Sequence, residues 1–401
     1  MSLPPDARRY LWAVGVQRLG TGFTLPFTLI LLHEVRGISL PTVGLLMAIP
    51  GVVGLATVPT GGALIDRFGP RAVLFGCQLL MAAGQLLLAF ATTPALALVA
   101  LLLNGIGLGP SFPAGNSLLA TLVPDPSMVA RAYGLQFTVI NAAIGVGTLV
   151  SSAVVDVHRA VTFEALFVAA GVASLLMGLL LPAASRPVAS DQAAPSSYRL
   201  VWEDRVFRRV CFAGFLFAMT GYAALDTGLP AFARVEGSVP PSTIALAFTV
   251  NTVLIVSLQL PVVRWVRTWR RTRALALAAS LWGASWLLLG LAPSTPVALL
   301  FAALFGLGEV FQSPAYSPLV NALSTEETRG RYNALSGAMF SIAFVLSPAL
   351  SGVLIGNDLG WVWITGLVVG SVVTALVLLS LRTSLTDEQD GLLSVTAPAP
   401  G

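Results

Sequence analysis

Three ionisable side chains lie inside long apolar segments of this sequence, where a charge is costly and usually serves function. Arg18 lies beside Gln17 about two turns into the first segment, and Glu309 lies near the middle of the tenth. Asp226 lies in the outer half of the seventh. A buried carboxyl group can load and release a proton, and a buried arginine can act as its counter-charge or hold an anionic substrate. These residues predict proton exchange coupled to the binding of a small molecule.

Each of the three has a structural alternative. Glu309 could be held by an arginine or by backbone groups. Arg18 could extend along its helix to the lipid headgroups, as long basic side chains do, and Asp226 could cap the outer end of its helix. Uncharged polar residues are also expected on inward faces, although such groups often only join membrane helices. They are Gln17, Asn104, Asn116, Gln136, Asn141, Asn251, Gln259 and Gln312. The predicted substrate and proton site consists of Arg18, Gln17, Asn104, Asp226, Asn251, Glu309 and Gln312.

The composition requires a membrane as the main solvent for the elements that carry these residues. Of 401 residues, 56% are hydrophobic and only 10% are charged, whereas a soluble domain has about 25% charged residues. A spanning helix needs about 20 apolar residues, and the runs are too long for barrel strands. We predict an all-α membrane protein with twelve transmembrane helices. The spans are 11–32, 42–61, 72–91, 94–122, 132–155, 162–182, 210–233, 242–263, 274–291, 296–320, 332–355 and 361–381.

The basic residues predict how the chain is oriented. The sequence has no lysine, so all 22 basic residues are arginines. Of these, 18 lie in one alternating set of loops and ends, 3 lie in the opposite set, and Arg18 lies inside a span. Cytoplasmic loops carry the basic excess, so both termini are predicted to be cytoplasmic. The net charge of +4 therefore reflects topology, and we expect no nucleic-acid partner.

The chain is predicted to consist of two related halves. A six-helix bundle over 1–182 is followed by a cytoplasmic linker over 183–209, a second bundle over 210–382 and a disordered tail over 383–401. Gly105, Gly107 and Pro113 recur as Gly306, Gly308 and Pro314 with a displacement of 201. A shared register of this kind indicates two pseudo-symmetric six-helix bundles, with a substrate site between them near mid-membrane.

A charged stretch between the second and third spans predicts a conformational gate. It holds Gly62, Asp66, Arg67, Gly69 and Arg71, and we interpret it as a short hinge at the cytoplasmic face. It resembles the corresponding loop of the major facilitator superfamily of transporters, whose pattern is Gly, three residues, Asp-Arg, one residue, Gly and a basic pair. Pro70 replaces the first basic residue here. We expect Asp66 to tie the first half to the start of the eleventh span, beside Arg329 and Arg331.

Further residues resemble the bacterial multidrug-exporter branch of this superfamily. Gly308-Glu309, Pro314 and Arg329-Gly330-Arg331-Tyr332 carry that likeness, which implies a location in the inner membrane of a bacterial cell. The run Gly145 to Ser152 is similar to a degraded antiporter signature, and Ser347 to Gly352 is its counterpart in the second half. The arginine that many proton-coupled exporters carry in the fourth helix is absent, with Asn104 as the polar group there.

We therefore predict a secondary-active exporter of small amphipathic organic molecules, a proton-coupled carrier that works by alternating access. The resemblance implies that Arg18 and Glu309 face a central cavity formed by the first, fourth, seventh and tenth helices. The alternatives are an importer or facilitator of a metabolite, a lipid transporter on the same fold, or a non-transporting membrane protein. No enzyme motif, P-loop or histidine-rich metal site is present, so no enzyme activity and no cofactor are expected. The predicted partners are a small-molecule substrate, protons and the lipid bilayer, and the chain is expected to be a monomer.

Overall fold

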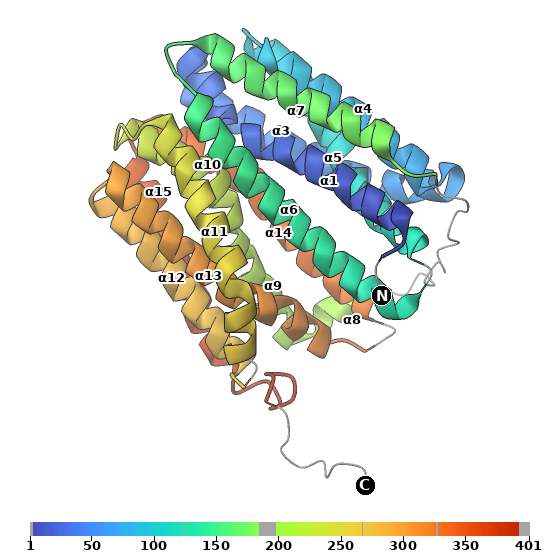
Figure 1. Ribbon diagram of the computed structural model, residues 1–401. Helices are drawn as coiled ribbons and strands as arrows, with labels where there is room; N and C mark the ends of the chain where they lie inside the picture. Colours follow the sequence, from blue (N-terminus) through green and yellow to red (C-terminus); the bar gives the residue numbers. More distant parts are fainter. Residues whose placement is uncertain (1–2, 124, 184–197, 267, 326–327, 393–401) are drawn as a thin grey trace.

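The helices of the first half form one bundle in the computed structural model (Figure 1). The structure describes residues 3–123, 125–183, 198–266, 268–325 and 328–392. In this half the elements are α1 (Pro5–Thr24), α2 (Thr28–Ile30), the π-helix η1 (Leu31–Val35), α3 (Leu40–Phe68), α4 (Pro70–Ala89), α5 (Pro94–Leu122), α6 (Pro126–Val154) and α7 (Ala160–Leu180).

The second half forms the other bundle, coloured from yellow-green to red in Figure 1. Its elements are α8 (Tyr198–Glu203), α9 (Arg205–Thr220), α10 (Tyr222–Val235), α11 (Pro241–Val266), α12 (Arg271–Leu291), α13 (Thr295–Ala322), α14 (Arg329–Ile355) and α15 (Gly360–Leu381). The first of its spans begins at Arg205, inside the segment predicted as a linker. The predicted boundaries of the two halves stay a prediction.

The predicted all-helical membrane fold is confirmed. Eleven segments of the described chain are long and apolar enough to cross a membrane, with Arg205–Val235 counted as one. The helical segment Pro5–Val35 is less apolar and occupies the place of the predicted first span. No strand is present in the described residues.

Two pairs of long helices make the most extensive contacts between the described parts of the bundles. α3 packs against α14, and α6 packs against α11, which lies beside it in Figure 1. The proximal end of the bundles is the end that holds the described parts of the two termini. The distal end is the opposite end, which holds the turns after η1, α6 and α10. Gly44 near the distal end of α3 has no room for a side chain, because a Cβ there would lie 2.7 Å from Cα of Gly352. The halves are therefore in close backbone contact at the distal end.

The repeated glycines make equivalent contacts in the two halves. Gly105 of α5 packs on α3, and Gly306 of α13 packs on α11. Gly107 of α5 packs on α4, and Gly308 of α13 packs on α12. The second and third spans of each half therefore approach the fourth span through the same two positions. The register found in the sequence corresponds to repeated helix packing.

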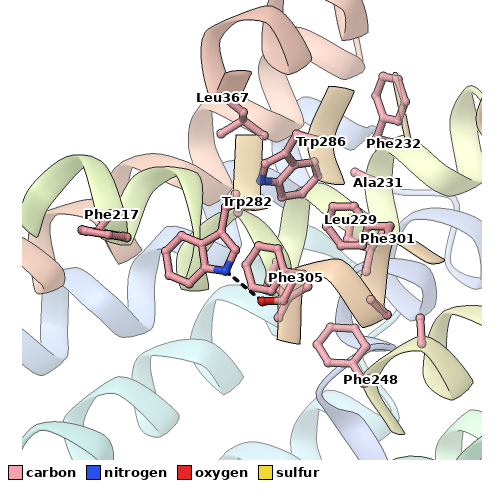
Figure 2. Packing of buried hydrophobic residues seen from close by; sticks show 14 of the residues in the cluster. Phe217, Leu229, Ala231, Phe232, Phe248, Trp282, Trp286, Phe301, Phe305 and Leu367 are labelled. Atoms are coloured by element: carbon pink, nitrogen blue, oxygen red, sulfur yellow. Dashed lines mark hydrogen bonds between the residues drawn. The ribbon is translucent and has the colours of Figure 1, made fainter. Parts of the chain in front are cut away.

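A cluster of aromatic side chains fills the second half (Figure 2). Trp282 and Trp286 of α12 are fully buried, and the ring of Trp282 stacks on Phe305 with centroids 4.9 Å apart. The indole Nε1 of Trp282 donates a hydrogen bond of 2.9 Å to the carbonyl oxygen of Phe305. This satisfied polar group lets a large aromatic residue occupy the interior without an unpaired donor.

The charged stretch Gly62 to Arg71 differs from the predicted short loop. α3 continues through Asp66 and Arg67 to Phe68, and α4 starts at Pro70. Only Gly69 lies between the two helices, with φ of 78°, a conformation that glycine adopts without strain. A proline at the first position of α4 loses no helical hydrogen bond, so a turn of one residue is enough.

The seventh span, predicted over 210–233, consists of two helices. It breaks at Gly221, between α9 and α10. A Cβ at Gly221 would overlap the ring of Trp282, and Nε1 of Trp286 donates a 2.6 Å hydrogen bond to the carbonyl oxygen of Thr220. The tryptophans on α12 therefore both crowd the break and satisfy its backbone.

The segment after α15 also differs from the prediction, which placed disorder from residue 383. As far as Leu392 the structure shows turns, in which Asp390 is completely buried. Its carboxylate accepts hydrogen bonds from the backbone N–H and the hydroxyl of Thr272, 2.8 and 2.9 Å long. An acid at the N-terminus of α12 is stabilised by the unpaired N–H groups there. Residues 393–401 lie outside the described residues.

Candidate substrate and proton site

Two carboxyl groups and an amide form a polar cluster inside the second half. Nδ2 of Asn251 on α11 donates a 3.0 Å hydrogen bond to Oε1 of Glu309 on α13. The carboxyl groups of Glu309 and Asp226, which lies on α10, are near enough to interact electrostatically. Both carboxyl side chains are half-buried. The cluster therefore joins three helices through groups that can bind a proton or a cation.

Tyr222 extends this cluster and was not among the predicted site residues. Its hydroxyl donates a 3.0 Å hydrogen bond to Oε1 of Gln312, and it also interacts electrostatically with Glu309. Its ring lies edge-on to Trp282, with centroids 5.4 Å apart. Tyr222 and Asp226 are one turn apart on α10 and share a face, a spacing that could have indicated the pair.

Local packing explains why the carboxyl group of Glu309 lies where it does. Gly306 allows Asn251 to approach α13, because a Cβ there would lie only 3.2 Å from Nδ2 of that amide. Gly308 allows the ring of Trp282 to lie against the other side of the helix. The sequence Gly-Leu-Gly-Glu therefore clears space on two faces of α13 and leaves the glutamate beside α11.

Arg18 lies in a different polar site, inside the first half. It borders a cavity of about 30 Å³, which has room for one or two water molecules. Gln17, Tyr10, Gln78 and Gln136 line the same cavity. Within the described part of the chain, Nε of Arg18 and Oε1 of Gln78 are buried without a hydrogen-bond partner. A donor and an acceptor thus remain available to water or to a polar group of a substrate.

The structure brings together four of the seven predicted site residues. Asp226, Asn251, Glu309 and Gln312 belong to one cluster, the last through Tyr222. Arg18 and Gln17 form the separate site in the first half, and Arg18 makes no hydrogen bond or ion pair with the described members of that cluster.

Asn104 lies in neither site. Its amide oxygen accepts a 3.4 Å hydrogen bond from Gln85 on α4, and its Nδ2 donates to the carbonyl oxygen of Ala100. It therefore joins α5 to α4 and fits the interhelical role that such amides often have.

An ion pair that was not predicted from the sequence joins the two halves at the distal end. Arg234 of α10 forms a two-pronged contact with Glu34 of η1, in which Nε donates a 2.6 Å hydrogen bond to Oε1 and Nη2 contacts Oε2. Nη1 of Arg234 also donates a 2.8 Å hydrogen bond to the carbonyl oxygen of Val239. The first half has an equivalent contact between His33 and the carbonyl oxygen of Ile38, because these two residues precede Arg234 and Val239 by 201 positions. The sequence signal that could have indicated this pair is the opposite charge of Glu34 and Arg234 at the ends of equivalent spans.

The predicted gate residues surround the turn at the proximal end. The guanidinium of Arg67 lies 5.1 Å from the ring centroid of Phe68, and Nε of Arg71 donates a 3.5 Å hydrogen bond to the carbonyl oxygen of Leu181 at the end of α7. A Cβ on Gly62 would meet nothing within 4 Å.

The predicted tie from Asp66 to the start of α14, where Arg331 lies, stays a prediction. Asp66 lies in the last turn of α3, and Arg331 lies in the first turn of α14. The backbone of Arg329 begins α14, but its side chain lies outside the described residues.

The two runs of small residues lie at the junctions between helices of the two halves. In α6, a Cβ on Gly145 would lie 2.5 Å from Cγ2 of Thr252 on α11, and the hydroxyl groups of Thr148 and Thr249, also on α11, are 3.0 Å apart. In α14, Gly352 packs on Gly44 of α3. Small residues let helix backbones approach closely, so each run seals one junction between the bundles.

Comparison with known proteins now places this architecture in a family. The family model of the Major Facilitator Superfamily matches residues 11–239 and 236–395. The chain belongs to the major facilitator superfamily. Membership indicates a transporter embedded in a membrane, with a small-molecule substrate, and not an enzyme.

The similar sequences have several functions. A Na⁺, Li⁺, K⁺/H⁺ antiporter of Planococcus maritimus is 22% identical over 388 residues, covering 88% of this chain and 90% of the relative. The multidrug resistance protein MdtH of Yersinia enterocolitica is 27% identical over 356 residues, covering 86% and 84%. Identities of 22% and 27% do not assign the chain to one branch of the family.

Solved structures share the fold. A point mutant of the nucleoside transporter NupG aligns with a TM-score of 0.79 at 15% identity, covering 94% of this chain and 99% of NupG. A bacterial homologue of the human lysosomal transporter Spinster, facing inward and occupied, aligns with a TM-score of 0.72 at 15% identity, covering 97% and 99%. These similarities concern architecture alone.

Proposed function

We propose that this chain exports small amphipathic organic molecules across the inner membrane of a bacterium, as a monomer, in exchange for protons. The observation that carries the proposal is the cluster in which Glu309, held by Asn251, lies near Asp226 beside the break in the seventh span. Ionisable groups inside membrane spans mark ion and substrate pathways, and discontinuous helices commonly form such sites in transporters.

The two carboxyl groups supply a means of exchange. Two nearby carboxylates repel each other, so a proton or a cationic substrate that neutralises one of them relieves the repulsion. A proton and a substrate that compete for this position cannot be bound at the same time, so each change of the side that is open carries one or the other. Competition of this kind couples proton entry to substrate exit. Asn251 orients Glu309 in either state, because an amide can donate to an ionised or a protonated carboxyl group.

Alternating access requires the halves to move as units about the junctions α3–α14 and α6–α11. The close contacts of Gly44 with Gly352, together with the pair formed by Glu34 and Arg234, favour a state closed at the distal end. The distribution of arginines supports an orientation in which the distal end is the extracytoplasmic one. Arg18 contributes the opposite charge in the other half, where it holds an anionic part of the substrate or water.

Transport of ethidium into or out of proteoliposomes with an imposed pH gradient tests this function. We expect the wild-type protein to accumulate ethidium against its gradient only when protons flow the opposite way. Glu309→Gln keeps the size and hydrogen bonding of the side chain but cannot release a proton, so exchange of ethidium should persist while accumulation is lost. Glu236→Gln is the matched control, because Glu236 is an exposed carboxyl group at the distal end of α10, and it should accumulate ethidium normally.

Two results would count against proton-coupled export. Accumulation by Glu309→Gln equal to that of the wild type would remove Glu309 from the coupling and leave Asp226 to be tested in the same way. Transport of ethidium down its gradient alone, at a rate that the pH gradient does not change, would identify a facilitator.

Exchange of monovalent cations for protons is the second candidate function. The similarity to a Na⁺, Li⁺, K⁺/H⁺ antiporter favours it, and a pair of carboxyl groups can bind a small cation as well as a proton. The same proteoliposomes, loaded with the pH-sensitive dye pyranine, should change internal pH on addition of Na⁺, Li⁺ or K⁺ if this is the activity. A response to these ions without ethidium transport would replace the first proposal with the second.

A further inference from the structure

A long apolar groove lies on the outer face of the first half, between α1 and α6. Its volume is about 650 Å³, and its walls come from these two helices and from Leu3. Trp12, Val16 and Leu19 line it on α1, and Val139 and Val146 line it on α6. The indole of Trp12 is 76% exposed. The residues of α1 and α6 that line this groove are different from those that line the Arg18 cavity inside the bundle. The groove therefore faces away from the interior of the bundle.

The proximal end of the groove is basic. Arg8 and Arg131, both exposed, line it near the starts of α1 and α6. Asp6 and Asp125 lie at the same end of these helices, and neither lines the groove. Positive charge at one end of an apolar groove complements an anionic headgroup joined to an acyl chain.

The dimensions of the groove fit one leaflet of a membrane. From Arg8 to Leu19 the axis of α1 rises by about 16 Å, and one leaflet contributes about 15 Å of hydrocarbon thickness. Trp12 lies one turn from Arg8, at the depth where indole rings prefer the boundary between headgroups and acyl chains. A single lipid would therefore place its headgroup at the arginines and its chain along the apolar walls.

We propose that the groove between α1 and α6 binds one anionic phospholipid of the proximal leaflet, with its phosphate at Arg8 and Arg131. Gly15 and Ala143 line the groove and keep it open by their small size. The bound lipid covers the junction of α1 with α6, the helix that also packs against α11 of the other half. The site is separate from the proposed substrate and proton site and does not depend on its function.

Quenching of Trp12 fluorescence by lipids with brominated acyl chains tests the proposal. The full-length protein is reconstituted in phosphatidylcholine vesicles that contain a small fraction of brominated phosphatidylglycerol or, in parallel, of brominated phosphatidylcholine. Subtracting the signal of Trp12→Phe isolates the contribution of this tryptophan. We expect the apparent affinity for brominated phosphatidylglycerol to exceed that for brominated phosphatidylcholine by about fivefold for each arginine that contacts the headgroup.

The preference should fall to that of phosphatidylcholine in the double variant Arg8→Gln and Arg131→Gln. Arg9→Gln is the matched control, because Arg9 is exposed at the same depth but does not line the groove, and it should retain the preference. Ala142→Phe should reduce quenching by filling the groove with a side chain while both arginines remain. Elution as a single species from size-exclusion chromatography checks that each variant is folded.

Equal quenching by the two brominated lipids in the wild type would overturn the proposal and indicate ordinary boundary lipid. A loss of preference in Arg9→Gln as large as in the double variant would also overturn it, because diffuse attraction to a basic surface would then explain the result.

Discussion

Neutralising Glu34 should open the transporter at its distal end. In the wild type, Arg234 of the second half holds both carboxylate oxygens of Glu34 in the first half. The contact can exist only while the distal ends are together, so it stabilises one state of the transport cycle selectively. Glu34→Gln keeps the shape of the side chain and removes its charge. Arg234 retains its hydrogen bond to Val239, so the variant leaves no completely unpaired cation.

The size of the effect follows from the partial burial of the pair. The side chains are 19% and 21% exposed for Arg234 and Glu34, which places them between a surface pair and a buried one. Hydrogen bonds to charged groups contribute about 1.5–3 kcal/mol, and solvent screening lowers that contribution. We therefore expect a loss of about 1–2 kcal/mol, which changes the ratio of the two states by about five- to thirtyfold.

Distances between spin labels at the distal end measure this ratio. Labels on Thr92→Cys and Ala292→Cys report on opposite halves, because these exposed residues follow α4 and α12. The native cysteines Cys77 and Cys211 are buried and are replaced by serine beforehand. The longer-distance population should grow in Glu34→Gln.

The control is a second ion pair at the same end. Nη2 of Arg36 donates a 2.8 Å hydrogen bond to Oε1 of Glu164, and both residues belong to the first half. Glu164→Gln should leave the distances unchanged, since that pair stays together in every state. Identical distance distributions in Glu34→Gln and the wild type would refute the reasoning, as would equal shifts in the two variants.

Three further outcomes are expected. Arg18→Ala should lower ethidium transport at least about tenfold with normal membrane insertion, because it removes the cation that borders the polar cavity of the first half, and a charge inside a span usually serves function; full transport by the purified variant would contradict this. Gly308→Ala should destabilise the protein by about 1–3 kcal/mol through overpacking, since its Cβ would lie 2.5 Å from Trp282, whereas Gly366→Ala meets open space and should not lower the thermal unfolding midpoint. Asp66→Asn should favour opening at the proximal end, and unchanged distances between spin labels on the proximal ends of α5 and α13 would argue against that role.

Features encoded along the chain could be predicted from sequence. The length of an apolar run is compared directly with the thickness of a bilayer, so the number and approximate positions of the spans followed without tertiary information. The glycines displaced by 201 residues revealed the repeat, because each position meets the same kind of neighbour in its own half. Buried charge was equally visible, since Arg18, Asp226 and Glu309 interrupt runs that are otherwise apolar.

Only the tertiary structure decided which of these side chains meet. Asn104 and Asn251 are both amides in apolar spans, yet one joins Gln85 within its bundle and the other binds Glu309. Nothing local distinguishes them, because the partner of each lies on another helix.

The same reason applies to the breaks and contacts that could not be predicted. The seventh span is broken at Gly221 by tryptophans of α12, two spans later in the chain. Glu34 and Arg234 are 200 residues apart, and they become a pair only because the two bundles close at the distal end. The sequence by itself determined the spans, the repeat and the buried charges, and the packing of one helix on another decided which of those charges form a site.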